Sequence, residues 1–243
     1  MTNVENLSVE TLLDFCDSAG GNVQIDRITL QPGELIPCQG YPEERLYYVQ
    51  SGYGVLSVYA EIENGDNYIL RPDVTAYHTP GLLHEIANTG EMPMHLVVFR
   101  VRGGLVPEGA EDGVQKWTSI GKSAAVGTGF WYTDIFNLQE NETAREGQFL
   151  QVWGVGMRRA QKLVSGEVLQ LGGGRATRRH AHSETNETFY ILMGEGFFET
   201  DGIRTAFRPG SVCSVPVGVV HSVENAGKTP MLYVCITTFE ENG

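Results

Sequence analysis

The chain has 243 residues, of which 41% are hydrophobic, and this is enough for one large all-β domain or two of medium size. Its net charge is −13, whereas a nucleic-acid-binding protein needs a basic face to displace phosphate counterions, so no nucleic acid and no anionic membrane surface is expected as a partner. The 30 glycines and 10 prolines predict many turns and no long helices.

The amino-terminal sequence, MTNVENLSVETLLDFC, lacks the basic segment and apolar run of a signal peptide. No apolar run reaches the length of about 18 residues that a membrane-spanning helix requires. The four cysteines form no CxxC pair, and a chain of this length needs no disulfide staples. Together these features predict a reducing, cytoplasmic setting.

Residues 8–18 are predicted to form a short helix, with Ser8 as its N-cap and Leu12, Leu13 and Cys16 as an apolar stripe. The remaining chain consists of short apolar runs separated by Gly, Pro and Asn, which is typical of a β-sandwich or barrel. Strands are expected within 23–30, 45–52, 54–62, 95–101, 166–173, 188–196, 211–218 and 231–238.

Two blocks of sequence occur twice in the same order. Residues 45–54, RLYYVQSGYG, align with residues 187–196, ETFYILMGEG, and residues 80–88, PGLLHEIAN, align with residues 217–225, VGVVHSVEN. The two offsets are nearly equal, which predicts a duplicated domain. We therefore divide the chain into an N-terminal helical segment (1–20), a first barrel (21–103), a connector (104–148) and a second barrel (149–243).

The second copy contains residues with the spacing of a metal site. His180 and His182 alternate on what we expect to be one strand, so that both side chains point the same way, and Glu187 and His221 follow. Three imidazoles and one carboxylate suit Fe, Mn, Ni, Co or Zn, and they leave two positions open on an octahedral ion. The alternative, a core with incidental histidines, leaves clustered imidazoles without partners.

These residues resemble the paired motifs of the cupin superfamily, G-x5-H-x-H-x3–4-E-x6-G and G-x5-P-x-G-x2-H-x3-N. All ten fixed positions match: Gly174, His180, His182, Glu187, Gly194, Gly210, Pro216, Gly218, His221 and Asn225. The resemblance implies an all-β fold of two tandem jelly-roll cupin barrels. It also implies one divalent transition metal per chain, held by His180, His182, Glu187 and His221, with Fe favoured and Mn, Ni, Co or Zn as alternatives.

The first copy departs from this pattern. Gln39 and Tyr41 stand where the paired histidines are expected, Arg45 stands at the glutamate position and Asp73 replaces the opening glycine of the second motif, so that only His84 is retained. Because a cation at the carboxylate position repels a metal ion, we expect a degenerate, metal-free barrel. It either braces its partner barrel or a dimer, or forms a second pocket in which Arg45 and His84 bind an anion.

The metal site leaves the reaction class open. Two adjacent open positions suit a dioxygenase, which the resemblance slightly favours, whereas Lewis-acid chemistry suits an isomerase, cyclase, lyase or decarboxylase. A cupin that binds a small molecule without catalysis is the third option. In each case a small molecule is the expected partner, and a homodimer is an option for the assembly.

Three residues are candidates for substrate contacts. Arg178 lies two residues before His180 and is expected to share its face, where it either grips a substrate carboxylate or lies on the surface. Phe189 and Ile191 share the parity of Glu187 on their strand, so they are expected to line the substrate cavity or to form ordinary barrel core.

Overall fold

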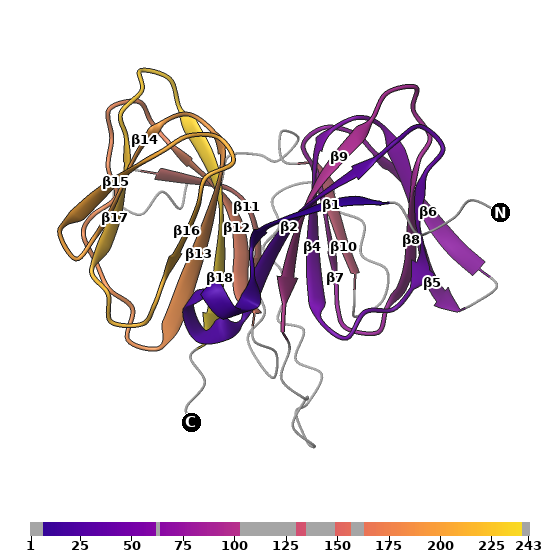
Figure 1. The fold of residues 1–243 in the computed structure, drawn as a ribbon, viewed down its shortest axis with the longest axis horizontal. Helices are drawn as coiled ribbons and strands as arrows, with labels where there is room; N and C mark the ends of the chain where they lie inside the picture. Colours follow the sequence, from indigo (N-terminus) through magenta and orange to yellow (C-terminus); the bar gives the residue numbers. More distant parts are fainter. Residues whose placement is uncertain (1–6, 62–63, 103–129, 135–148, 157–162, 240–243) are drawn as a thin grey trace. The chain divides into compact units, whose positions relative to one another are not determined.

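The computed structural model describes residues 7–61, 64–102, 130–134, 149–156 and 163–239 (Figure 1). These residues form two compact units. The described part of unit 1 comprises residues 7–14, 23–102 (apart from 62–63) and 130–134. The described part of unit 2 comprises residues 15–22, 149–156 and 163–239.

Unit 1 consists of two antiparallel sheets, one with the strand order β1-β2-β9-β4-β7-β10 and one with the order β3-β8-β5-β6. Leu56 of one sheet and Leu96 of the other belong to a single buried core cluster, so the sheets pack face to face. The strands are β1 (Ser8–Leu13), β2 (Val23–Leu30), β3 (Leu35–Gln39), β4 (Glu44–Ser51), β5 (Gly54–Glu61), β6 (Asn64–Leu70), β7 (Val74–His78), β8 (Leu83–Asn88), β9 (Met94–Val101) and β10 (Phe130–Asp134).

Unit 2 has the same two-layer construction, drawn in orange to yellow in Figure 1, with the strand orders β11-β12-β18-β13-β16 and β15-β14-β17. Phe189 and Phe198 pack across the two layers with ring centroids 5.5 Å apart. The strands are β11 (Phe149–Gly156), β12 (Leu163–Leu171), β13 (Thr185–Met193), β14 (Gly196–Thr200), β15 (Ile203–Phe207), β16 (Val212–Val215), β17 (His221–Asn225) and β18 (Met231–Phe239). The predicted all-β fold of two tandem barrels is therefore confirmed.

The predicted N-terminal helix is wrong. Residues Ser8–Leu13 form strand β1, which pairs antiparallel with β2, and only two 3₁₀ turns follow, η2 (Phe15–Asp17) and η3 (Ala19–Gly21). Thr11 donates a hydrogen bond to Asp26 of β2 at 2.9 Å. So short a segment is a poor isolated helix, and the open edge of β2 offers it a full ladder of backbone partners.

The segment Phe15–Asn22 belongs to unit 2 although it follows β1 in the chain. The backbone N–H of Ala19 donates to Ser214 Oγ at 2.9 Å, and Asn22 Nδ2 donates to the carbonyl of Phe239 at 3.2 Å. Gly20 has a φ of +69°, and a Cβ there would lie 2.6 Å from Asn186 Nδ2. The turn therefore fits closely against β13, β16 and β18.

The internal repeat extends to individual hydrogen bonds. Asn88 ends β8, and its amide donates to the carbonyls of Leu30 and Met92 while its Oδ1 accepts from Gly90 N–H. Asn225 ends β17, and its amide donates to the carbonyls of Leu171 and Thr229 while its Oδ1 accepts from Gly227 N–H. The two asparagines thus close the same loop in both units.

Two further pairs show the same correspondence. Gly52 and Gly194 have φ values of +87° and +96°, and a Cβ at either would lie within 2.6 Å of the first residue of another strand, Met94 of β9 or Met231 of β18. Asp73 has a φ of +68° where Gly210 has +87°. The N–H of Asp73 donates to the carbonyl of Val49 on β4, and the N–H of Gly210 donates to the carbonyl of Ile191 on β13. Tyr48 donates a hydrogen bond to Asp73 at 2.6 Å, which helps to hold this strained aspartate.

The predicted connector, residues 104–148, lies mostly outside the described residues. Its described part, β10, is an edge strand that pairs antiparallel with β7 of unit 1. Among the described residues, no helix has the length and apolar character needed to cross a membrane.

Candidate metal centre

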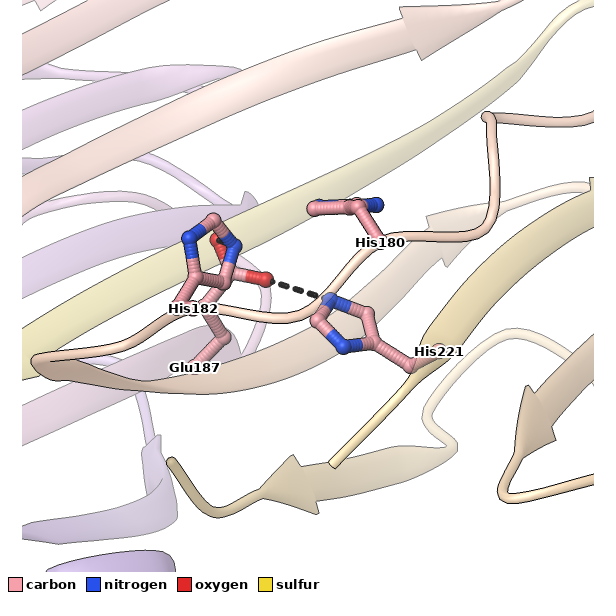
Figure 2. Close-up of side chains that lie close together, drawn as sticks. All are labelled: His180, His182, Glu187 and His221. Carbon is pink, nitrogen blue, oxygen red and sulfur yellow. Dashed lines mark hydrogen bonds and ion pairs between the residues drawn. The ribbon is translucent and has the colours of Figure 1, made fainter. Parts of the chain in front are cut away.

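The four predicted ligands lie together in unit 2. Each of His180, His182, Glu187 and His221 offers one donor atom, and these atoms all lie within 4.8 Å of one another. Figure 2 shows the three imidazoles gathered around the Glu187 carboxylate. Glu187 lies on β13 and His221 opens β17, so the two facing sheets of the unit both supply donors.

His180 and His182 do not lie on a regular strand, contrary to the prediction. They belong to the segment between β12 and β13, which is held at isolated positions. His180 exchanges two backbone hydrogen bonds with His221, of 2.8 and 3.1 Å, and the carbonyl of His182 accepts from Gly218 N–H. Gly218 has a φ of +79°, a conformation that glycine adopts readily, so the glycine turn of the second motif positions the first motif.

Backbone carbonyls fix the orientation of two imidazoles. Nδ1 of His180 lies 2.8 Å from the carbonyl of Arg178, and Nδ1 of His221 lies 3.0 Å from the carbonyl of Val219. Because a carbonyl only accepts, each Nδ1 must carry the proton. In the neutral imidazole Nε2 then presents a lone pair, which is the arrangement of metal-binding histidines.

The distances between donors fit one ion. Nε2 of His221 lies 2.9 Å from Glu187 Oε2, and Nε2 of His182 lies 3.3 Å from Glu187 Oε1. With metal–ligand bonds of about 2.1 Å, two neighbouring ligands of an octahedral ion lie about 3.0 Å apart. His182 Nε2 is buried and has no hydrogen-bond partner, although it faces the carboxylate. A divalent cation would satisfy this nitrogen, so the residues fit a metal.

The electrostatics also favour a cation. Burial by itself raises the pKa of Glu187, but the contacts with His182 and His221 outweigh it and hold the pKa at about 2. The facing carboxylate raises the pKa of His182 above its usual value. At neutral pH the site therefore contains an ionised and largely buried carboxylate, and such a charge favours a partner of opposite sign.

The predicted substrate contacts have different surroundings. Phe189 is buried, and its ring centroid lies 6.0 Å from that of His221, so it forms part of the wall beside the ligands. Ile191 is fully buried in the core cluster of unit 2. The side chain of Arg178 is exposed, and its carbonyl is the group that orients His180.

Sequence reasoning missed one neighbour of the ligands. Cys235 of β18 is buried, and its Sγ lies 3.7 Å from Glu187 Oε1. The alternation of β18 places Cys235 on the same face as Tyr233, which the sequence pattern would allow one to see. Cys235 and Glu187 are 48 residues apart in the sequence, so no local sequence pattern indicates that they are neighbours.

Unit 1 holds different residues at the corresponding positions. Gln39 pairs with His84 as His180 pairs with His221, and Gly81 N–H donates to the carbonyl of Tyr41 as Gly218 N–H donates to that of His182. Arg45 of β4 lies opposite His78 of β7, as Glu187 of β13 lies opposite Val215 of β16. These pairings are consistent with the alignment of Gln39, Tyr41, Arg45 and His84 with the residues of the second copy.

These residues satisfy one another. His84 Nδ1 lies 2.9 Å from the carbonyl of Leu82, which leaves Nε2 as an acceptor, and Tyr47 donates its hydroxyl proton to that nitrogen at 2.8 Å. Arg45 is buried, hydrogen-bonded to Glu43, and its guanidinium carbon lies 3.1 Å from the centroid of the Tyr41 ring. The lone pair that a metal would require of His84 is thus already occupied.

Comparison with known proteins supports a cupin domain in this chain. Residues 167–237 match the family model of the cupin domain. An oxalate-binding protein of Thermotoga maritima is 34% identical over 68 residues, which are 28% of this chain and 56% of that protein. An uncharacterized protein of Methanocaldococcus jannaschii is 31% identical over 62 residues, 26% of this chain and 50% of that protein. The chain thus spans about half the length of the curated relatives it matches.

Solved structures match the chain over nearly its whole length. A variant of oxalate decarboxylase from Bacillus subtilis covers 100% of this chain and 75% of its own, with a TM-score of 0.68 and 16% identity. A cupin 2 conserved barrel domain protein from Leptotrichia buccalis covers 98% of this chain and 91% of its own, with a TM-score of 0.60 and 15% identity. Both units have the cupin fold.

The structural comparison also extends to AerE from Microcystis aeruginosa. It covers 98% of this chain and 95% of its own, with a TM-score of 0.66 and 12% identity. At such low identities the likeness concerns the fold, and function has to be argued from the residues of the site.

Proposed function

We propose that the chain is a bicupin enzyme that binds one divalent transition metal in unit 2 and acts on a small carboxylic acid. The observation that carries the proposal is the convergence of three imidazoles and one carboxylate at the separations of ligands on one ion. His180, His182, Glu187 and His221 are the proposed ligands. Three histidines and a carboxylate leave two positions of an octahedral ion for substrate.

Decarboxylation is the reaction that the comparisons support best. The chain resembles an oxalate-binding protein in sequence and an oxalate decarboxylase in fold. This favours the lyase alternative over the dioxygenase that the motif first suggested. The metal, when bound, would supply Lewis-acid polarisation of a substrate carboxylate. We propose Mn(II) as the ion, since the Bacillus subtilis oxalate decarboxylase contains Mn(II) centres, and Fe(II), which the motif favoured, as the alternative.

The protein's own residues have distinct proposed roles. The backbone carbonyls of Arg178 and Val219 keep His180 and His221 in the tautomer that ligates a metal. The buried ring of Phe189 excludes water from one side of the centre. The exposed guanidinium of Arg178 is proposed to attract the substrate carboxylate, and the fully buried Ile191 to support Phe189 from within the core cluster that both residues belong to.

For unit 1 we propose a metal-free, degenerate barrel with a structural role. Arg45 occupies the glutamate position and Tyr47 occupies the lone pair of His84, so neither residue type nor geometry favours a cation. An anion pocket at Arg45 is also disfavoured, because Glu43 already neutralises that charge and Tyr41 covers it.

Reconstitution with single metals tests the proposal. The protein is stripped of metal, reloaded with Mn(II), Fe(II) or Zn(II), and incubated with oxalate and other small mono- and dicarboxylic acids under air and under argon. We expect about one equivalent of metal per chain and release of CO2 without stoichiometric O2 uptake. The His221→Ala variant, which lacks one ligand, is the inactive control.

Two outcomes would contradict this assignment. Stoichiometric O2 consumption with loss of substrate would restore the dioxygenase reading. Two equivalents of tightly held metal per chain would show that unit 1 also has a metal site, against the geometry of Arg45 and Tyr47.

A further inference from the structure

Cys235 touches the carboxylate that we assign as a metal ligand. It lies on β18, is 3% exposed, and its Sγ lies 3.7 Å from Oε1 of Glu187, within hydrogen-bonding range for sulfur. The two oxygens of Glu187 therefore have separate neighbours: Oε2 faces His221, whereas Oε1 lies between His182 and Cys235.

This contact bears on how the carboxylate is oriented. A glutamate side chain has three rotatable bonds and a terminal torsion that is broad, so its orientation needs support from neighbours. Groups that hydrogen-bond to metal ligands fix their orientation and tune the affinity of the site. A thiol is a weak donor, so it can orient an oxygen without withdrawing much of the charge that a cation needs.

We infer that Cys235 is a positioning residue of the metal centre, which acts through Glu187 by holding Oε1 toward His182. The inference rests on the proposed metal site and adds a residue that the cupin motifs do not contain. The competing interpretation is that Cys235 is only a small apolar residue of the core cluster.

The chain offers a matched control in Cys213. Phe189 on β13 has Cys235 of β18 as its cross-strand neighbour on one side and Cys213 of β16 on the other. Cys213 packs against the same core cluster. A purely packing role predicts similar effects for both cysteines, whereas positioning of Glu187 predicts an effect for Cys235 alone.

The test is the affinity for Zn(II), measured by competition with a chelating dye, in the full-length protein. Zn(II) suits the experiment because three histidines alone can hold it, so variants that lack the carboxylate still bind. We expect Cys235→Ala to weaken binding about tenfold, and Cys213→Ala to leave it unchanged. Cys235→Val fills the space of the thiol with an apolar group that cannot donate, and should match Cys235→Ala. Circular dichroism verifies that each variant is folded. If Cys235→Ala does not fold, the Zn(II) affinity of Cys235→Val tests the inference instead.

A double-mutant cycle separates positioning from packing. In the Glu187→Ala background, Cys235→Ala should cause no further loss of affinity, because the group through which it acts is gone. A tenfold loss in that background, an equal loss in Cys213→Ala, or wild-type affinity in both Cys235 variants would overturn the inference. Absence of Zn(II) binding by the wild-type protein would instead overturn the proposed metal site, and this inference with it.

Discussion

The paired asparagines Asn88 and Asn225 allow the two units to be perturbed in the same way. Each side chain is buried, donates to two backbone carbonyls and accepts from one backbone N–H. Replacing either with alanine removes three hydrogen bonds and leaves three backbone groups to find new partners. We expect each variant to destabilise its own unit by a similar amount.

The magnitude follows from this count. A hydrogen bond contributes about 1 kcal/mol net, and a buried group left unpaired costs about 1–3 kcal/mol. Water that enters the gap recovers part of this for the carbonyls. A loss of about 3 kcal/mol is therefore expected in each case, which is about a hundredfold increase in the opening equilibrium of the affected unit.

Native-state hydrogen exchange read by mass spectrometry is the suitable assay, because it reports each unit through its own peptides. The Asn88→Ala protein should exchange faster in unit 1 and keep its metal. The Asn225→Ala protein should exchange faster in unit 2 and retain metal less well, since β17 also carries His221. Losses below about 1 kcal/mol in both variants, or equal loss of metal in both, would refute the reasoning.

Three further predictions follow from the structure. His182→Ala should abolish tight metal binding, and Glu187→Gln should weaken it less, while circular dichroism shows that both variants keep their fold. Unfolding of the His182→Ala variant would instead indicate that the metal has a structural role. Burial lowers the pKa of His84 to about 4, whereas an unfolded histidine has a pKa of about 6.5. Between these two pH values the unfolded chain binds the proton and the folded chain does not. The free energy of unfolding of unit 1 should therefore fall by up to about 3 kcal/mol as the pH drops from 6.5 to 4. Urea unfolding at several pH values measures this slope, which His84→Gln should reduce without abolishing, because burial also lowers the pKa of the neighbouring His78. A Cβ on Gly196 would lie 1.8 Å from the carbonyl of Glu224, so Gly196→Ala should destabilise unit 2 by at least about 2 kcal/mol, whereas Gly172→Ala, with 3.5 Å to its nearest neighbour, should have little effect in thermal unfolding.

The sequence predicted those features that depend on local chemistry. Glycines with positive φ, such as Gly52 and Gly194, and the loop-closing Asn88 and Asn225 occur in both copies because the same backbone turns require them. The four candidate ligands could be selected because their residue types and spacing are specific, and the structure brings their side chains together. Strand positions followed from short apolar runs between turn residues.

What the sequence did not predict depends on contacts between distant segments. An apolar stripe in residues 8–18 is compatible with a helix, and only the open edge of β2 makes Ser8–Leu13 a strand. The segment with His180 and His182 is extended but irregular, since it pairs at isolated positions. The contact between Cys235 and Glu187 depends on the register between β13 and β18. No periodicity in either segment encodes such a register.

The two barrels show how one fold meets the same electrostatic requirement in two ways. In unit 2 the position on β13 bears a carboxylate, Glu187, and imidazoles face it, which is why we propose a cation from outside the chain at this site. In unit 1 the corresponding position on β4 bears Arg45, a cation that belongs to the chain, and Glu43 supplies the opposite charge. The hydroxyl of Tyr47 then completes His84. In unit 1 the Arg45–Glu43 pair thus supplies within the chain the opposite charge that we propose a metal supplies at Glu187. Replacing Arg45 alone with a carboxylate would leave two like charges, Glu43 and the new side chain, close together in a buried site.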